Sequence, residues 1–420
     1  MTDARADQML AADGTPLKTS LRRAMRAQKG RALMLVAPLL IFVLVSFLLP
    51  IGDMLFRSVE NEIVPNTLPK TVVALGDWDS AGQELPGEPV FAALHDDLTV
   101  AVENKTNTRL GQRLNYENSG MSSLMRGVVR DLRRMDPDQP FKEQFVEADP
   151  KWGDLNTWRT IKTFSGPFTS GYLLNAVDLQ RTPDGVAVKP AGERIYVTLF
   201  LRTLLMSLAI TFTCFLLGYP IAYLLATLPL RTSNLLMILV LLPFWTSLLV
   251  RTASWKVLLQ QQGVINDLLV WSGLISNANR LVMINNATGT IITMTHILLP
   301  FMILPLFSVM KGIKPSYVRA AKSLGANDWT AFWRVYFPQS VPGVGAGAIL
   351  TFILAIGYYI TPELVGGTSG VFISNRIAYH ISTSLNWGLA AALATLLLVV
   401  VLALYWTYDR IVGIDNVKLG

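Results

Sequence analysis

Residues that build catalytic and metal sites are scarce in this sequence. Its 420 residues include one cysteine and three histidines. A lone cysteine cannot form a disulfide within the chain, and Cys214 stands in an apolar run, where core packing is the expected role. His95, His296 and His380 show none of the spacings typical of metal ligands. The pattern G-x4-G-K-[ST] is also absent, so the chain is not expected to bind ATP through a P-loop.

Charged residues are scarce as well. They make up 15% of the chain against 51% hydrophobic residues. Soluble domains carry roughly a quarter charged residues, so a membrane protein is expected. Segment 57–196 holds 20 acidic and 16 basic residues, which leaves 9 acidic and 20 basic residues elsewhere. The basic excess flanks apolar segments, as the positive-inside rule predicts, and nucleic-acid binding is disfavoured.

Six apolar segments are long enough to predict membrane-spanning helices. The first follows a basic cluster at residues 22–31. It is too long for a signal peptide, and no A-x-A-like cleavage site follows it. The predicted spans are Ala32–Pro50, Thr203–Leu228, Leu235–Val250 (with an extension to Leu259 left open), Thr288–Met310, Val344–Thr361 and Trp387–Tyr408.

Two further apolar stretches are interpreted differently. Gly263–Leu274 has 12 residues and contains Asp267, so an interfacial or re-entrant segment is expected rather than a span. Gly343, Gly345 and Gly347 form a G-x-G-x-G pattern where a membrane helix is predicted to begin. There the pattern indicates close helix packing rather than nucleotide binding.

The loops predict the orientation of the chain. The basic tail at residues 1–30 is expected in the cytoplasm, which places segment 57–197 outside. Loop 311–342 carries five basic residues and one acidic residue, and the number of preceding spans also places it inside. The C-terminal tail at 414–420 is expected inside as well.

Segment 57–197 is long enough to form a small domain outside the membrane. Periodicity predicts helices over Pro89–Glu103 and Ser122–Met135 and favours strands over Thr71–Leu75 and Ile195–Leu199. The sequence leaves open whether this domain is α/β or mainly α. Three tryptophans predict a packed core in it: Trp78, Trp152 and Trp158.

Loop 311–342 has the pattern of two short helices that meet at a glycine. Ser316 is expected to cap the first helix, and Gly325 to end it. The residues at i, i+3, i+4 and i+7 give this helix one apolar face. They are Tyr317, Ala320, Ala321 and Leu324.

The second helix of the loop is expected to be capped by Asn327 and ended by Pro338 and Pro342. Its face carries four aromatic residues, Trp329, Phe332, Trp333 and Tyr336. Such a face docks in a groove of a partner or packs against the chain's own helices, and the spacing alone leaves both open.

The run RAAKSLGANDWTAFWRVYFP, which begins at Arg319, resembles the EAA loop of ABC importer permeases, with the pattern E-A-A-x3-G-x9-I-x-L-P. Ala320, Ala321, Gly325 and Pro338 match that pattern, and Val335 and Phe337 are conservative substitutes. The resemblance implies a coupling helix that inserts into an ATP-binding subunit. The residues expected to form this coupling site are Arg319, Ala320, Ala321, Leu324, Gly325, Ala326, Trp329, Phe332, Trp333 and Pro338.

Arg319 departs from the pattern, which has Glu at this position. A Glu would complete a capping box with Ser316 and would suit the helix N-terminus, so Arg loses about 0.3–1 kcal/mol of helix-dipole stabilisation. The salt bridge that the family's Glu makes to its ATPase is in doubt here, whereas the fold of the loop is expected to survive.

Three more stretches resemble spermidine/putrescine-type permeases of the MetI-like family. They are PFWTSLLVRTASWKVLLQQQGVINDLL from Pro243, GYYITPELVGG from Gly357 and GYPIAYLLA from Gly218. The resemblance covers about 198–413 and the first helix and does not reach the insertion. It implies an all-α bundle of six transmembrane helices. The expected divisions are a tail at 1–30, a first helix at 31–56, an insertion at 57–197, a five-helix core at 198–413 with the coupling loop at 312–342, and a tail at 414–420.

A polyamine is the favoured substrate, and opines or other amine or amino-acid derivatives are the alternative. Polycations favour carboxylates and aromatic faces, which Tyr358, Tyr359 and Glu363 supply, whereas Arg251 and Lys256 oppose a cation. The expected pathway residues are Thr246, Arg251, His296, Tyr358, Tyr359 and Glu363. For those at helix ends, snorkelling to the membrane interface is the alternative role.

The resemblance also implies the partners. ATP and Mg²⁺ would be bound by two separate ATP-binding subunits, and this chain would hold no cofactor and would not be an enzyme. A second permease chain and a periplasmic substrate-binding protein would complete an importer in the bacterial inner membrane. The sequence does not decide whether the second permease is identical to this chain, and the resemblance favours a different one. The competing class is a secondary transporter or channel, but the inverted repeats or mid-membrane ionisable residues that it predicts are not evident.

Overall fold

The computed structural model describes residues 17–182 and 185–412. The predicted tail at 414–420 and the first 16 residues of the predicted N-terminal tail lie outside them. Internal contacts divide the chain into Met1–Arg57 and Ser58–Gly420, so each unit is described by itself. The described part of the first unit is a helical rod that contains the first predicted span. It consists of α1 (Leu17–Val43), the π-helical turn η1 (Leu44–Leu48) and α2 (Leu49–Arg57).

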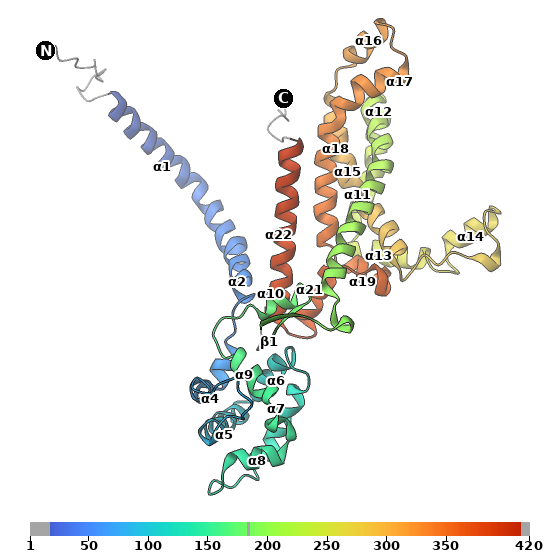
Figure 1. The fold of residues 1–420 in the computed structure, drawn as a ribbon. Coiled ribbons are helices and arrows are strands. Elements are labelled where there is room, and N and C mark those ends of the chain that lie inside the picture. The colour runs from blue at the N-terminus through green and yellow to red at the C-terminus, as the bar shows by residue number, and fades with distance from the viewer. Residues whose placement is uncertain (1–16, 183–184, 413–420) are drawn as a thin grey trace, which may run out of the picture. The chain divides into compact units, whose positions relative to one another are not determined.

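Four long helices form a bundle in the second unit (Figure 1). They are α11 (Tyr196–Thr227), α15 (Ala287–Gly312), α18 (Phe337–Gly357) and α22 (Trp387–Val412). α11, α15 and α18 pack around a shared apolar core that includes Ile210, Met302 and Ala355. Cys214 lies buried in this core, which confirms its predicted packing role, and its thiol contacts the Thr295 carbonyl at 3.5 Å.

The predicted third span is bent rather than straight. It consists of α12 (Leu230–Leu241), the 3-10 turn η4 (Leu242–Trp245) and α13 (Leu248–Leu258), and its two halves meet at 96°. Pro243 cannot donate a backbone hydrogen bond within the turn, and Ser247 then caps a new helix by accepting from the Val250 N–H at 3.2 Å. The described residues therefore hold five helices long enough to span a membrane, or six with this pair.

The predicted fifth span begins earlier than expected. Residues 328–357 form one continuous helix, so Pro338 and Pro342 do not end the second loop helix. The cause is the π-helical turn η6 (Phe332–Tyr336), in which the Phe337 N–H bonds to the Phe332 carbonyl across five residues. The wider turn precedes Pro338, whose missing N–H would interrupt a regular α-helix.

Glycines allow α18 to pack closely, as predicted. A Cβ on Gly347 would lie 2.8 Å from the Met302 sulfur and 2.9 Å from the Met302 carbonyl oxygen on α15. A Cβ on Gly345 would lie 2.0 Å from the Tyr408 hydroxyl on α22. The G-x-G-x-G pattern therefore serves helix contact on two sides of α18.

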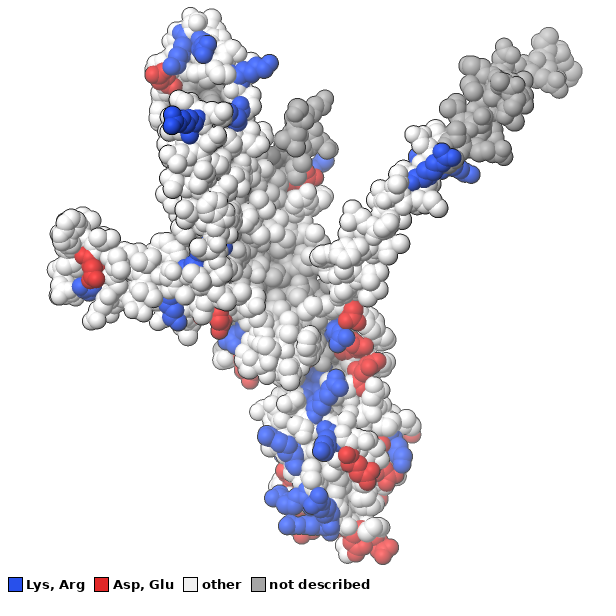
Figure 2. Space-filling model, turned by 180° about the vertical axis from the view of Figure 1, so that it is seen from behind, with Lys and Arg blue, Asp and Glu red and all other residues white. Residues whose placement is uncertain are grey.

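Short helices connect the long ones. α14, at eight residues, is too short to span a membrane, in line with the interfacial or re-entrant prediction for its segment. The connecting elements are α14 (Val264–Trp271), η5 (Asn277–Asn279), α16 (Pro315–Ser323), α17 (Asp328–Ala331), α19 (Ile360–Val365), α20 (Gly367–Gly370) and α21 (Ile373–Ser382). Figure 2 shows little charge on the bundle face turned to the viewer, whereas Lys, Arg, Asp and Glu side chains gather on segment 58–195.

Segment 58–195 is mainly helical, which decides between the two predicted classes. Its helices are α3 (Ile63–Thr67), α4 (Pro69–Ala74), α5 (Glu88–Glu103), α6 (Asn107–Asn115), α7 (Met121–Asp131), α8 (Phe141–Ala148), η2 (Pro150–Gly153), α9 (Leu155–Thr163), α10 (Gly171–Asn175) and η3 (Ala191–Glu193). One antiparallel hairpin joins β1 (Leu179–Thr182) to β2 (Gly185–Val188), with Leu179 opposite Val188. Trp152 and Trp158 are buried in its core and Trp78 packs against it, as predicted.

The two strands predicted by periodicity in this segment are wrong. Thr71–Leu75 lies in α4, because Pro69 opens a helix there and the Asp97 carboxylate accepts from both the N–H and the hydroxyl of Thr71, each at 2.7 Å. Ile195–Leu199 forms the start of α11. In both places a cap outside the segment overrides its β-branched composition. The predicted helices are confirmed as α5 and α7, although α7 ends at Asp131.

An aspartate joins segment 58–195 to α11. The buried Asp178 carboxylate accepts from the backbone N–H groups of residues 195, 196 and 197, at 3.1, 3.0 and 2.8 Å. These donors are the free N–H groups of a helix start, which a carboxylate satisfies well. Asp178 has φ +59°, a left-handed conformation that Asp tolerates better than most residues.

The ring of Tyr172 on α10 joins the segment to α22. It lies so close to Gly388 that a Cβ there would be 2.3 Å from its Cε2. The Arg113 guanidinium, buried between the Tyr172 and Phe164 rings at 4.5 and 4.8 Å from their centroids, holds this ring from behind. Glu117 pairs with Arg113 at 2.9 Å. The segment is therefore fastened to the bundle through packing and buried polar contacts.

Candidate coupling loop and substrate pathway

The first helix of the loop ends as predicted but begins differently. α16 starts with Pro315 after Lys314, and the Ser316 side chain makes no capping bond, so the predicted Ser316 cap is wrong. Proline fixes φ near the helical value, and the helix therefore starts two residues earlier, with Lys314 at the N-cap position. Gly325 ends it at φ +92°, where a side chain would be strained. Asn327 caps α17 by accepting from the Thr330 N–H at 2.8 Å, as predicted.

Two of the four loop aromatics pack against the bundle. The Phe332 and Tyr336 rings stack on each other at 5.9 Å and meet Tyr223 of α11 at 6.0 and 5.1 Å. Tyr219 contacts Phe332 from the next turn of α11, at 6.1 Å. For these two residues, packing against the chain's own helices is the correct alternative, and this packing fixes the loop on the end of α11.

The other two loop aromatics face outward. Trp329 and Trp333 are 71% and 44% exposed, and their rings lie 5.6 Å apart. Leu324, at the end of α16, is 89% exposed. In the loop that carries this ridge, residues from α16 and its C-terminal end, η6 and the start of α18 line a hollow of about 360 Å³. Its lining comprises Tyr317, Ala320, Ala321, Leu324, Val335 and Gln339, so the predicted face of α16 forms one wall of the hollow.

The charges of the loop lie around this ridge. Lys322 and Asp328 form an ion pair across the turn at Gly325. Arg319 is exposed, and within residues 17–182 and 185–412 its guanidinium takes part in no ion pair or hydrogen bond. Ala326 is half-buried with its N–H on the Ala321 carbonyl, and Pro338 is exposed at the start of α18. The outer face of the loop thus combines exposed apolar side chains with unpaired positive charge.

Three of the expected pathway residues lie together. Arg251 of α13 is close enough to act electrostatically on both His296 of α15 and Tyr358, which follows α18. His296 accepts from the Trp255 indole N–H at 3.0 Å. The Nε and Nη1 atoms of Arg251 are buried and have no hydrogen-bond partner among the described residues. A guanidinium in this state favours an acceptor supplied from outside the chain.

Two other expected pathway residues meet at Asn375 of α21. Its amide donates to the Glu363 carboxylate at 2.6 Å and to the Tyr359 carbonyl at 2.8 Å. Thr246 stands apart at the end of η4, where its hydroxyl donates to the Pro243 carbonyl at 2.9 Å. Sequence reasoning missed Asn375 and Trp255, because their roles depend on α13, α19 and α21 meeting the bundle.

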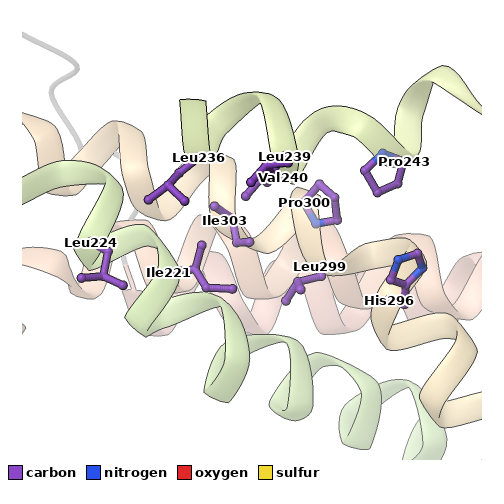
Figure 3. Close-up of a pocket in the computed structure, with 10 residues that line it drawn as sticks. All are labelled: Ile221, Leu224, Leu236, Leu239, Val240, Pro243, His296, Leu299, Pro300 and Ile303. Carbon is purple, nitrogen blue, oxygen red and sulfur yellow. The ribbon is translucent and has the colours of Figure 1, made fainter. Parts of the chain in front are cut away.

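An apolar hollow of about 370 Å³ opens beside His296 (Figure 3). Residues of α11, α12, η4 and α15 line it, and His296 is the single side chain among them with a polar group. The lining comprises Ile221, Leu224, Leu236, Leu239, Val240, Pro243, His296, Leu299, Pro300 and Ile303. It offers a cation no carboxylate, so any charge recognition falls to the groups around Arg251 and Glu363.

Residues 200–412 match the protein family described as "binding-protein-dependent transport system inner membrane component". The spermidine/putrescine transport system permease protein PotB of Escherichia coli is 34% identical over 224 residues, which cover 53% of this chain and 81% of that protein. The inner membrane ABC transporter permease protein YdcU of the same organism is 32% identical over 51% of this chain and 71% of that protein.

Solved structures include a bacterial alginate ABC transporter in complex with a periplasmic protein that holds an alginate pentasaccharide. One of its chains is 18% identical, with a TM-score of 0.45 over 54% of this chain and 80% of that chain. Segment 58–195 lies outside the residues that match the family.

Proposed function

Because the chain belongs to the family of inner membrane components of binding-protein-dependent transport systems, and is an ABC importer permease, we propose that it forms half of the substrate pathway. A second, different permease chain forms the other half. Two ATP-binding subunits hydrolyse ATP on the cytoplasmic side, and a periplasmic protein delivers the substrate. Both termini lie in the cytoplasm, and segment 58–195 lies outside, as the loop charges favour.

The loop at 312–342 carries this proposal. Its exposed Trp329–Trp333 ridge and the hollow in the same loop suit insertion into a groove of the ATP-binding subunit. Phe332 and Tyr336 fasten the ridge to α11, so that movement of the ATP-binding subunit reaches the bundle. ATP binding and release then drive the pathway between outward and inward access.

Replacing both ridge tryptophans tests the coupling role. Trp329→Ala with Trp333→Ala is expected to weaken binding of the ATP-binding subunit at least tenfold, because exposed aromatic anchors contribute about 2 kcal/mol or more each at an interface. The measurement is retention of the ATP-binding subunit on tagged permease in nanodiscs, together with uptake in cells.

Trp271→Ala is the matched control, because Trp271 is 86% exposed but lies on α14, away from the loop. It should leave retention of the ATP-binding subunit unchanged. A wild-type chain that never retains such a subunit, or a double variant that retains it and transports normally, would contradict the proposed role.

A polyamine is the proposed substrate. The name of the relative at 34% identity supports this, since that protein is a spermidine/putrescine permease. Glu363 and the aromatic side chains of Tyr358 and Tyr359 are suited to a cation. One observation favours the alternative, an amine that also carries a carboxylate, as opines do: two buried Arg251 nitrogens have no acceptor among the described residues.

Thermal unfolding of the cognate substrate-binding protein separates these substrates. A rise in its Tm with spermidine or putrescine and none with octopine supports the polyamine. The reverse result would assign Arg251 to substrate carboxylate and reject the polyamine proposal, while leaving the importer class intact.

A further inference from the structure

Four arginines form a stripe that begins on α7 and continues into the turn after it. They are Arg126, Arg130, Arg133 and Arg134, and we call them the arginine stripe. All four are exposed, whereas the opposite side of α7 is buried through Met121, Leu124, Met125 and Val128. Arg126 and Arg130 are four residues apart on α7 and therefore share one helix face, while Arg133 and Arg134 lie in the turn that follows Asp131.

The arginine stripe lines a hollow of about 540 Å³, together with Gly127 and Val129. One of its charges has a carboxylate nearby, since Arg130 lies 3.4 Å from Asp131. Arg126 donates to the Ser122 carbonyl. Within the described ranges, Arg133 and Arg134 take part in no ion pair. Arg126 and Arg130 are like charges four residues apart on a helix, a repulsion that an anionic ligand would offset.

The hairpin of α6 and α7 determines where the arginine stripe points. α6 leads to Tyr116, whose hydroxyl donates to the Ser384 carbonyl of the bundle at 3.0 Å. α7 packs antiparallel against α6 and therefore runs away from the bundle. Figure 2 shows Lys and Arg side chains along the length of segment 58–195, including a group near the end that is farther from the bundle, with Asp and Glu side chains beside them.

We propose that the arginine stripe binds carboxylates on the surface of the substrate-binding protein that delivers cargo to this permease. This inference rests on the proposed function and names the contact surface on segment 58–195. Arginine suits the task because its planar fork pairs with carboxylates through two hydrogen bonds. Segment 58–195 is net negative, with 20 acidic and 15 basic residues. Because the rest of its surface repels an acidic partner, the basic stripe would direct such a partner to one place.

Two other ligands fit the arginine stripe less well. A polyamine would be repelled by four positive charges, so the stripe does not serve the substrate itself. Anionic lipid headgroups lie in the plane of the membrane, whereas α7 carries the stripe away from the end of the bundle. A soluble acidic protein arriving from outside meets the stripe directly.

The test uses the complete importer in nanodiscs, with both permeases, the ATP-binding subunits and the purified cognate binding protein. ATP hydrolysis is measured against binding-protein concentration. Arg130→Glu with Arg133→Glu should raise the half-saturating concentration at least tenfold and leave the maximal rate unchanged, because it alters encounter rather than turnover. Poly-L-glutamate should inhibit wild type and lose that effect on the variant.

Arg181→Glu with Arg194→Glu is the matched control, since it makes the same charge change on exposed arginines of the same segment outside the stripe. Arg130→Lys with Arg133→Lys should show a partial shift, because the charge stays and the fork is lost. A shift below twofold in the glutamate variant, or an equal shift in the control, overturns the proposal. So does a shift that follows the anionic lipid content of the nanodisc.

Failure of the proposed function would look different. In that case the wild-type assembly would show no stimulation of ATP hydrolysis by any binding protein. Normal stimulation of wild type together with an unaltered variant would reject the arginine stripe alone.

Discussion

Removal of the Asp178 carboxylate should loosen segment 58–195 from the bundle. The informative substitution is Asp178→Gly, because glycine suits the φ of +59° and adds no backbone strain. Alanine would add roughly 1–2 kcal/mol of strain at this φ and would obscure the result. Glycine leaves the three N–H groups at the start of α11 without their carboxylate acceptor.

The magnitude follows from the exposure of those three donors. Residues 195 and 197 are exposed, so water can replace the carboxylate there, but Tyr196 is buried. A hydrogen bond to a charged group contributes about 1.5–3 kcal/mol, and most of that value is lost where water has no access. With the weaker losses at the other two groups, we expect a decrease of about 2–4 kcal/mol in the free energy of unfolding.

Thermal unfolding of the permease in nanodiscs measures this decrease. Limited proteolysis should detect faster cleavage near the joint, between residues 189 and 195. Asp154→Gly is the matched control, because Asp154 caps α9 at an exposed position through one bond to the Asn156 N–H at 2.9 Å. Both substitutions replace Asp by Gly and therefore raise the flexibility of the unfolded chain equally. At an exposed N-cap, glycine lowers the free energy of unfolding by only a few tenths of a kcal/mol.

Equal losses of stability in the two variants would refute the reasoning. They would mean that the glycine acts through the unfolded chain and that the buried cap adds nothing. Asp178→Asn refines the result, since an amide oxygen keeps part of the cap and should recover more than half of the loss.

Three further predictions follow from buried groups. Burial and, to a lesser extent, two nearby positive charges lower the pKa of His380 to about 4, below the 6.5 of an unfolded His. The neutral imidazole therefore adds to the stability of the folded state in full above pH 6.5, and this stabilisation is lost as the pH falls toward 4. From pH 7 to pH 5 the wild type should lose roughly 2 kcal/mol of stability and His380→Gln much less, measured by thermal unfolding at both pH values. Gly347→Ala should destabilise the chain by about 1–3 kcal/mol through its contact with Met302, whereas Gly357→Ala, with open space around it, should change stability by less than about 1 kcal/mol. Arg251→Met should raise the Tm of the permease purified alone, because it removes two buried donors without partners, and should lower uptake by the assembled importer; a lower Tm would show that the chain itself satisfies them.

Much of the bundle was predictable because apolar length and helix packing are local properties of the sequence. The turn at Gly325, the cap at Asn327 and the small-residue contacts of α18 all follow from what one residue type allows. Pro243 followed by Ser247 also signalled the bend between α12 and α13. The prediction of that span used apolar length, which does not reveal a bend.

The errors arose where distant residues decide local structure. Thr71–Leu75 and Ile195–Leu199 have the composition of strands, but Asp97 and Asp178 supply caps that are 26 and 17 residues away from their partners Thr71 and Ile195. Likewise, spacing put all four loop aromatics on one face, and Tyr223 of α11 decides which of them face inward. Two Arg251 nitrogens have no acceptor among the described residues, so helical spacing in the sequence offered nothing from which to predict one.

The π-helical turn at Phe332–Tyr336 joins the second helix of the coupling loop to α18 as one continuous hydrogen-bonded helix. From Trp329 at the tip to Gly347 at the contact with α15 there are 18 residues, or about 27 Å of helix. A displacement of Trp329 can thus reach α18 through an unbroken hydrogen-bonded backbone, and the close glycine contacts are where α18 would shift against α15. If Pro338 and Pro342 had interrupted this helix, a displacement of Trp329 would have bent the chain at the interruption and would not have reached α18.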